Sequence, residues 1–393
     1  MKAMSPWQFT LFRIIFGSYL AVHFLHLAPW AGELFGKDGV LPDPSLNPAH
    51  GLFPNPLDLP LSGGALTGVL VLLAALSLCF AAGRWRRTAA VVLWFGWTAL
   101  FHRNNLIANP SVPYVGLLLI LTLLVPAGEP WSRGPRNADW AMPKWVFRAA
   151  WILMAAGYTF SGITKLPSES WTDGSAMRFL LDNPLARPGW IREALLALPD
   201  VVLKLLTWAT LAVELLFLPL ALWSRSRPWI WLTLVLMHLG IIAVVDFADL
   251  SLGMLMLHLF TFDPAWLKPL PSEPILVRFD GDCLMCSSTI RFVADEDRAK
   301  LVRFKPLEVE DGEEPDTMLV DAAGRTLDRS DGVLAILSVL GGHWRAMAMA
   351  GRLIPRPLRD ALYRFIARNR YRWFGKGNAC ALPSEALRER LLD

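Results

Sequence analysis

Two cysteines, separated by two residues, stand in a short stretch of the C-terminal third of the chain. The segment ILVRFDGDCLMCSSTIRF (275–292) places Cys283 and Cys286 between a β-branched run and a run with helical spacing. A thiol at a helix N-terminus faces unpaired backbone N–H groups, which favour the thiolate and lower the thiol pKa from about 8.5. A second thiol three positions further can resolve a mixed disulfide. We therefore predict a dithiol redox site with Cys283 as its nucleophile.

Neighbouring residues leave alternatives open. A zinc site built on the two cysteines would need further ligands, for which Cys380 and His343 are the candidates. Asp280 is either a turn residue or a proton relay, because a carboxylate otherwise raises the pKa of a nearby thiol by like-charge repulsion. Cys380 is either a third redox partner or a buried thiol. We expect thiol redox chemistry and no bound metal.

The elements around the cysteines predict a small α/β domain. Strand-like runs follow the first helix at 301–308 and 316–330, and the second of these contains a hairpin or loop at Ala323-Gly324. The segment GVLAILSVLGG (332–342) then has the composition of a buried helix. Strand, CxxC turn, helix, strands and helix follow one another in the order of a thioredoxin-like domain.

The rest of the chain is too apolar for a soluble domain. The 393 residues are 54% hydrophobic and 18% charged, with a mean hydropathy of +0.39. Because a helix needs about 20 apolar residues to cross a bilayer, about eight spans are predicted. They are 7–27, 64–82, 88–102, 112–128, 145–163, 201–223, 229–245 and 250–263.

The predicted organisation is therefore a polytopic α-helical membrane bundle over residues 1–266, a Pro-punctuated linker at 267–273 and a thioredoxin-like domain over 274–393. The net charge of +4 comes mostly from short loops and the C-terminal third. Membrane topology explains this pattern, and nucleic-acid binding is not predicted.

Lys and Arg are much denser in alternate loops, which predicts the orientation. The basic loops are 83–87, 129–144 and 224–228. We predict an inner membrane of a bacterium, with the N-terminus and the C-terminal domain in the cytoplasm and the loop after Lys165 on the extracytoplasmic side. The cysteines and Lys165 then face opposite sides of a core about 30 Å thick, so a quinone or a partner protein would have to connect them.

Lys165 ends a predicted span near Trp171 and Asp173. Partial burial would lower the pKa of its amine and make it a base, whereas the alternative is an interfacial anchor. Other ionisable residues within the spans are candidates for function or for packing. They are Arg13, His23, His26, His102, Glu214, His238 and His258.

The C-terminal motifs resemble the DCC family of thiol-disulfide oxidoreductases. The resemblance covers 274–383 and rests on FDGDCLMC, SDGVLAILSVLGG and IPRPLRDALYRFIARNRYRWFG, followed by Cys380. It implies a redox-active disulfide and a thiol-redox protein as partner, with Asp280, Cys283 and Cys286 as the family signature. The C-terminal motif implied by the family comprises Arg359, Asp360, Arg368, Asn369, Arg370 and Tyr371.

The membrane half resembles the HTTM domain, which is related to vitamin K-dependent gamma-carboxylases. The likeness spans about 5–266 and is most specific in YTFSGITKLPSESWTDGSAM. It implies that Lys165 is the base in oxygenation of a vitamin K-like quinol. It also implies a pocket for a quinone or membrane lipid, with Glu214, His238, Trp171 and Asp173 as candidate contacts.

This chain departs from the carboxylases in the segment NNLIANPSVPYVG, which lacks their histidine, and it lacks their large extracytoplasmic domain. The expected function is therefore an integral membrane thiol-disulfide oxidoreductase whose bundle binds a quinone or lipid. A carboxylase-like, quinol-oxidising enzyme that uses Lys165 is one alternative. A non-enzymatic lipid-binding or transport protein is the other.

Overall fold

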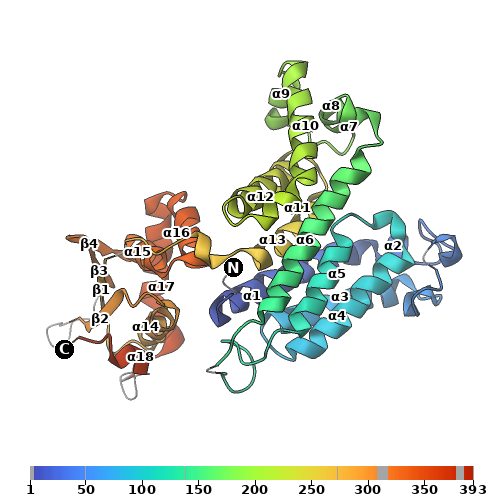
Figure 1. Cartoon of the computed structure of the whole chain (residues 1–393). Coiled ribbons are helices and arrows are strands. Elements are labelled where there is room, and N and C mark those ends of the chain that lie inside the picture. Colours follow the sequence, from blue (N-terminus) through green and yellow to red (C-terminus); the bar gives the residue numbers. More distant parts are fainter. Residues whose placement is uncertain are drawn as a thin grey trace. The chain divides into compact units, whose positions relative to one another are not determined.

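The structure is a computed structural model, and it forms two compact units, Ala3–Phe262 and Asp263–Asp393 (Figure 1). Cys380, a candidate redox residue, lies outside the described part of the chain. The described residues are 4–48, 50–137, 139–271, 273–307, 317–377 and 385–392.

The first unit consists, in its described residues, of helices joined by loops. Its longer helices are α1 (Pro6–Leu27), α3 (Gly63–Ala81), α4 (Arg86–Arg103), α5 (Val112–Leu123), α6 (Lys144–Lys165), α10 (Asp200–Leu215), α12 (Arg227–Val244) and α13 (Ala248–Thr261). Its shorter helices are α2 (Ala31–Phe35), α7 (Glu169–Thr172), α8 (Ala176–Asp182), α9 (Trp190–Leu196) and α11 (Phe217–Leu222). Each of the eight predicted spans overlaps one or two of these helices.

Four helices of the described chain are long and apolar enough to cross a membrane, which indicates an integral membrane protein. A fifth span is obtained if α9 and α10, which meet at 106°, count together. The four are Pro6–Phe35, Gly63–Ala81, Lys144–Lys165 and Arg227–Val244. This number is smaller than the predicted eight. The helices α5 and α13 are apolar but short, with 12 and 14 residues, and α4 carries Arg86, Arg87 and Arg103 at its ends.

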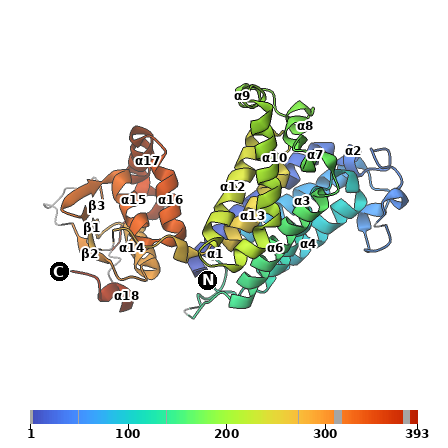
Figure 2. The ribbon, with the colours of Figure 1, turned by 45° about the horizontal axis from the view of Figure 1, so that its top comes forward.

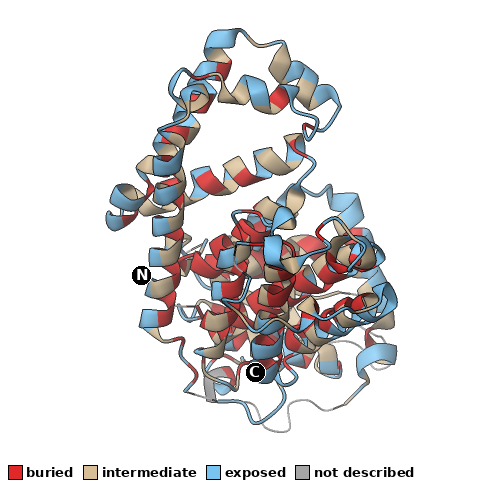
Figure 3. Ribbon diagram, turned by 90° about the vertical axis from the view of Figure 1, so that its right-hand side faces the viewer, coloured by how far each residue is buried: buried red, intermediate tan, exposed pale blue. Residues whose placement is uncertain are grey.

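The outer surface of these helices is apolar. Buried and exposed residues alternate along the helices of the bundle (Figure 3). Large apolar side chains stand on the exposed stripes, among them Leu72, Ile152 and Phe160, which are 70%, 67% and 66% exposed. A water-soluble bundle would bury side chains of this kind, so the exposed stripes suit contact with lipid.

Helix α1 begins at a capping box and packs closely on α3. The Ser5 hydroxyl accepts a hydrogen bond from the backbone N–H of Gln8, and the Gln8 side chain accepts one from the N–H of Ser5. Further along α1, Gly17 faces α3, where a Cβ would lie 2.7 Å from Cβ of Ala81 and 2.8 Å from the carbonyl oxygen of Ser77. Small residues of this kind let two membrane helices approach each other closely.

The second unit combines a small sheet with helices. Its strands are β1 (Ile275–Phe279), β2 (Val302–Pro306), β3 (Leu319–Ala322) and β4 (Arg325–Asp328). Its helices are α14 (Leu284–Glu296), α15 (Arg329–Leu340), α16 (Gly342–Arg352), α17 (Arg356–Phe374) and α18 (Glu385–Arg388).

The strands form one mixed sheet in the order β2-β1-β3-β4. Strand β1 pairs with β2 in parallel and with β3 in antiparallel orientation, and β3 and β4 form an antiparallel hairpin. The turn of this hairpin is Ala323-Gly324, as predicted, and both residues have positive φ, of 49° and 72°. A two-residue turn with two left-handed residues matches the twist of a hairpin.

Helices α14 and α15 pack on the sheet and bury a core with it, and α16 and α17 pack against these helices (Figure 2). The helix predicted over 332–342 is present as α15, and it contacts β3 and β4. Val277 of β1, Phe304 of β2 and Val320 of β3 are at most 1% exposed, and Ile290 and Val293 of α14 belong to the same cluster. The predicted small α/β domain is therefore present, and its core holds α14 against the sheet.

The close approach of α1 and α3 predicts the effect of a larger side chain at Gly17. Gly17→Leu should lower the free energy of unfolding by about 1–3 kcal/mol, because the added atoms overlap the backbone of α3. The thermal midpoint of the full chain in detergent measures this. Gly68→Leu on α3 is the matched control, since nothing lies within 4 Å of its Cβ position. Equal midpoints for the two variants would show that the helices are not in contact here.

Candidate functional site

The cysteines lie in the loop between β1 and α14. The Asp280 carboxylate, directly after β1, accepts a hydrogen bond from the backbone N–H of Asp282 at 3.0 Å, which closes a turn typical of Asp. Cys283 is the N-cap of α14, and its sulfur accepts a hydrogen bond from the backbone N–H of Cys286 at 3.4 Å. The strand-to-helix junction predicted from the sequence is present, and it places the Cys283 sulfur at the N-terminus of α14.

The two thiols differ in exposure. Cys283 is fully buried, whereas Cys286 is half-buried, and neither forms a disulfide. The segment after α17 lies against the cysteine loop: Lys376 forms an isolated antiparallel bridge with Cys283, and the N–H of Gly377 donates to the carbonyl of Asp282 at 3.0 Å. The buried Cys283 sulfur therefore lies in a loop that this segment contacts through its backbone.

Asp280 joins the cysteine loop to the end of α17. It is 8% exposed, and its Oδ2 accepts a hydrogen bond from Nη2 of Arg370 at 3.1 Å. The hydroxyl of Tyr371 donates to the same oxygen, and Arg370 also donates to that hydroxyl at 3.1 Å. A buried carboxylate needs such partners, so these bonds hold the C-terminal end of α17 beside the cysteines.

Burial and neighbouring charges shift the pKa values of Cys286 and Tyr371. Burial raises the pKa of the Cys286 thiol well above its ordinary value, and the Cys283 sulfur and the Asp280 carboxylate act in the same direction, whereas Arg370 opposes them. Burial and the hydrogen bond to Asp280 raise the pKa of Tyr371 to about 12. At neutral pH Cys286 and Tyr371 therefore both keep their protons.

The site also has the composition of a partial metal site. A carboxylate oxygen of Asp280 and the sulfurs of Cys283 and Cys286 all lie within 4.8 Å of one another. The carboxylate already accepts hydrogen bonds from Arg370, whose positive charge opposes a cation. His343 on α16, considered as a zinc ligand, does not belong to this group of described residues. The arrangement suits a dithiol beside a neutralised carboxylate better than a metal ion.

The other residues of the C-terminal motif lie away from the cysteines. Arg359 donates to Asp331 at 2.9 Å, and Asp360 accepts a hydrogen bond from Ser330, so both attach α17 to the start of α15. Eleven residues of helix separate Arg359 from Arg370, which corresponds to about 16 Å. Asn369 donates to the carbonyl of Phe365 one turn earlier at 2.8 Å, and Arg368 is exposed. The motif is therefore divided between packing and the thiol site.

A second candidate site lies in the first unit, at the end of α6. Lys165 forms an ion pair with Glu214 of α10, and its Nζ donates to Oγ of Ser161 at 3.0 Å. The same Nζ lies 4.8 Å from the centre of the Trp171 ring. The side chains of Lys165 and Glu214 are 22% and 6% exposed. Asp173 does not join them in the described structure, because it accepts a hydrogen bond from the N–H of Ser175 at 2.7 Å instead.

His238 belongs to a separate polar chain in the same unit. The hydroxyl of Tyr158 lies 2.6 Å from Nε2 of His238 and 2.8 Å from Nε2 of His258. Nδ1 of His238 lies 3.1 Å from Oγ of Ser251. Among the described residues, His238 forms no hydrogen bond or ion pair with Lys165. In the described residues, Lys165–Glu214 and Tyr158–His238–His258 are therefore two hydrogen-bonded groups that share helix α6.

Sequence reasoning missed several residues of these sites. Ser161 and Tyr158 stand four and seven positions before Lys165, so helical periodicity could have placed both on its face of α6. Lys376 and Gly377 had no such signal, because only the folding of the C-terminal segment onto the cysteine loop brings them there.

Comparison with known proteins identifies both parts of the chain. The family model of the HTTM domain matches residues 2–266, and that of the DCC1-like thiol-disulfide oxidoreductase matches residues 277–376. The uncharacterized protein YuxK of Bacillus subtilis is 32% identical over 136 residues, which cover 32% of this chain and 97% of that protein. A chloroplastic DCC family protein of Arabidopsis thaliana is 31% identical over 121 residues, with 28% and 70% covered. No solved structure matches the chain significantly.

The charges around Cys286 predict opposite effects of two substitutions. Asp280→Asn should lower the Cys286 pKa and speed the alkylation of Cys286 on the order of tenfold, because a negative charge is lost. Arg370→Gln should slow the alkylation of Cys286, because a positive charge is lost. In the unchanged chain, alkylation should stay slow at neutral pH and rise only at alkaline pH. The rates are measured by peptide mass spectrometry in a Cys283→Ser background, with Cys79 as internal reference. Changes of the same sign in both variants would contradict this electrostatic account.

Proposed function

Since the chain belongs to the HTTM domain family and carries a C-terminal DCC1-like thiol-disulfide oxidoreductase domain, we propose that it is an integral membrane thiol-disulfide oxidoreductase. The observation that carries the proposal is the position of Cys283 at the N-terminus of α14, with the N–H of Cys286 directed at its sulfur. In this reaction a disulfide of a protein partner is reduced to two thiols, while the dithiol of this domain is oxidised to a disulfide.

We further propose that the second unit is thioredoxin-like. A parallel β1–β2 pair, an antiparallel β3–β4 hairpin and a CxxC turn between β1 and α14 support this assignment. This arrangement brings the N-terminus of one helix to the end of a central strand, where a thiolate meets backbone N–H groups. The same elements leave Cys286 in the first turn of α14, within reach of Cys283.

Reduction of a partner would proceed in two steps. The Cys283 thiolate attacks one sulfur of the partner's disulfide, forming a mixed disulfide and releasing the other partner sulfur as a thiolate, which takes up a proton. Cys286 then gives its proton to Asp280 and attacks the Cys283 sulfur, so that the Cys283–Cys286 disulfide forms and the second partner sulfur leaves. The second partner sulfur leaves as a thiolate and takes the proton held by Asp280, whereas the first takes its proton from solvent, to which Cys283 released one on becoming a thiolate. Counted from the dithiol, the domain therefore loses two electrons and two protons, and the partner gains them. Because Cys283 is buried, its sulfur must first become exposed.

Asp280 is a candidate base for the second step. The Cys286 thiol holds its proton strongly, and the Asp280 carboxylate lies within 4.8 Å of its sulfur. Arg370 and Tyr371 both donate to one oxygen of this carboxylate, while its other oxygen faces the backbone of the turn. The carboxylate is therefore held in place next to the proton that has to leave.

The dithiol makes a direct prediction. Mild oxidation of the purified full chain should form a Cys283–Cys286 disulfide that added thiols reverse, and intact-mass and thiol measurements should show the loss of two thiols. Cys286→Ser should accumulate a mixed disulfide on Cys283 with a disulfide-containing probe protein, because the resolving thiol is absent. Cys79→Ser is the control and should behave like the unchanged chain. Equal thiol numbers before and after oxidation would exclude the redox function.

For the membrane unit, we propose a quinone or lipid pocket at Lys165. The ion pair with Glu214 and the Trp171 ring over the amine form a polar and aromatic surface at the end of α6, in a unit otherwise exposed to lipid. The related carboxylases imply a quinol as the ligand. We also propose the orientation expected from the loop charges, with Lys165 on the extracytoplasmic side and the dithiol domain in the cytoplasm, and eight spans in all.

This pocket can be tested independently of the cysteines. The organic extract of the purified full chain should contain a quinone, detected by its absorption spectrum. The double variant Lys165→Gln/Glu214→Gln should retain about tenfold less, because a hydrogen bond to a charged group is lost without leaving an unpaired buried charge. Lys204→Gln, an exposed lysine on α10, is the control. A chain without quinone that retains one lipid at Lys165 would instead favour the non-enzymatic alternative.

A further inference from the structure

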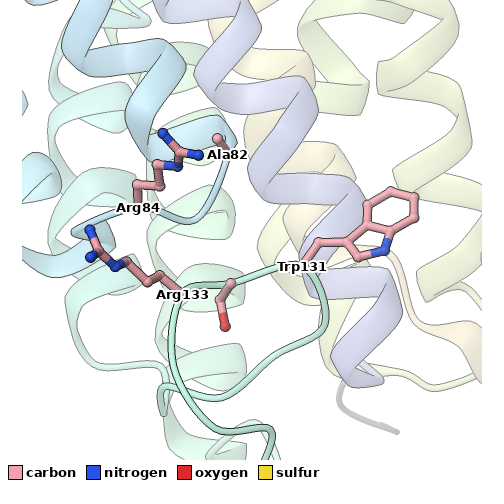
Figure 4. A pocket seen from close by; sticks show the side chains of 5 residues that line it. Ala82, Arg84, Trp131 and Arg133 are labelled. Carbon is pink, nitrogen blue, oxygen red and sulfur yellow. The ribbon is translucent and has the colours of Figure 1, made fainter.

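Two loops of the first unit border an open hollow that neither candidate site uses. The loop between α3 and α4 and the loop between α5 and α6 line a pocket of about 600 Å³ (Figure 4). The lining residues are Ala82, Arg84, Trp131, Ser132 and Arg133. Arg84 and Arg133 stand on one side of the view and Trp131 on the other.

The backbone of this pocket is firmly held. The N–H of Arg133 donates to the carbonyl of Gly83 at 3.1 Å, and Nη2 of Arg13 donates to the carbonyl of Trp131 at 3.2 Å. Gly83 has a φ of 71°, and a Cβ at this position would lie 1.7 Å from Nη1 of Arg13. Position 83 therefore requires glycine, so that the buried side chain of Arg13 can pass between the two loops. The backbone that forms the pocket walls is held by these specific contacts.

The pocket carries positive charge without a matching carboxylate. Glu129 lies 3.0 Å from Arg86 and 3.7 Å from Arg13, and both arginines are buried with it. In the described structure neither Arg84 nor Arg133 forms an ion pair with a carboxylate, and both side chains are exposed. Two guanidinium groups that line one hollow are suited to a phosphate group, which accepts several charge-assisted hydrogen bonds.

Tryptophans place this pocket at the level of the lipid headgroups. Trp85 and Trp131, next to the arginines, are 61% and 71% exposed, and Trp7 at the start of α1 packs edge-on against Trp131 with ring centres 5.4 Å apart. Exposed tryptophans around the end of a helix bundle are typical of a membrane–water interface. Basic pockets between helices at this level are suited to anionic headgroups.

We propose that the pocket formed by Arg84, Arg133 and Trp131 binds a phosphate group, supplied by an anionic membrane lipid at the ends of α3 and α5. The guanidinium groups hold the phosphate, and the Trp131 ring lies along the acyl boundary. The proposal is independent of the dithiol chemistry and of the pocket at Lys165, because it rests on different residues and predicts binding alone.

The test measures binding to the purified full chain in neutral detergent. Phosphatidic acid, phosphatidylcholine and inorganic phosphate are added separately, and native mass spectrometry and the thermal midpoint report binding. Arg84→Gln/Arg133→Gln removes two charges from the pocket, whereas Arg148→Gln/Arg225→Gln removes two exposed charges elsewhere in the first unit. Both substituted pairs are exposed, so folding should survive, and the thermal midpoint without lipid verifies this.

Phosphatidic acid should bind, and the pocket variant should bind it about thirtyfold more weakly, as expected for the loss of two surface arginines, while the control variant changes little. Stabilisation by inorganic phosphate alone, again lost only in the pocket variant, would support the phosphate site and assign it a soluble ligand. Equal weakening in the two variants, or binding of phosphatidylcholine as tight as that of phosphatidic acid, would overturn the proposal.

Discussion

The redox domain depends on one buried carboxylate. Asp280 directly follows β1, and a charge withdrawn from water at this point is tolerated only because Arg370, Tyr371 and the backbone of the turn satisfy it. These bonds fix the C-terminal end of α17 beside the cysteine loop. The next residues of the chain then pair with that loop, in which Cys283 is buried. The charge balance at the cysteine loop and the position of α17 are therefore consequences of the same interaction.

In the first unit, too, buried charges are stabilised by partners, although the surrounding medium is less polar. Hydrocarbon offers no water to a charge, so several buried ionisable groups of the bundle have charged or polar partners. Lys165 and Glu214 form one such cluster, and Glu129 with two arginines forms another. Asp249 accepts hydrogen bonds from the side chains of Tyr19 and Asn109. Outside these clusters the helices expose apolar side chains, which lipid can cover.

Local patterns were reliable where the physical cause is local. The alternation along β1, the two-residue turn at Ala323-Gly324 and the start of α14 at Cys283 each depend on residues within a few positions of one another. The number of membrane spans was less predictable. A hydropathy pattern does not show where α5 ends, nor that α4 carries arginines used for packing against neighbouring loops.

The sequence by itself determined the two kinds of solvent that this chain meets, the strand-to-helix turn that carries Cys283, and the pairing of a CxxC motif with a membrane bundle, because hydropathy and motif spacing are properties of adjacent residues. Only the tertiary structure decided that Arg370 belongs to the thiol site while Arg359 serves packing, that Glu214 and not Asp173 meets Lys165, and that Cys283 is covered. These contacts depend on which side chain, distant in the sequence, pairs with a buried charge. The packing of the helices and strands determines that pairing.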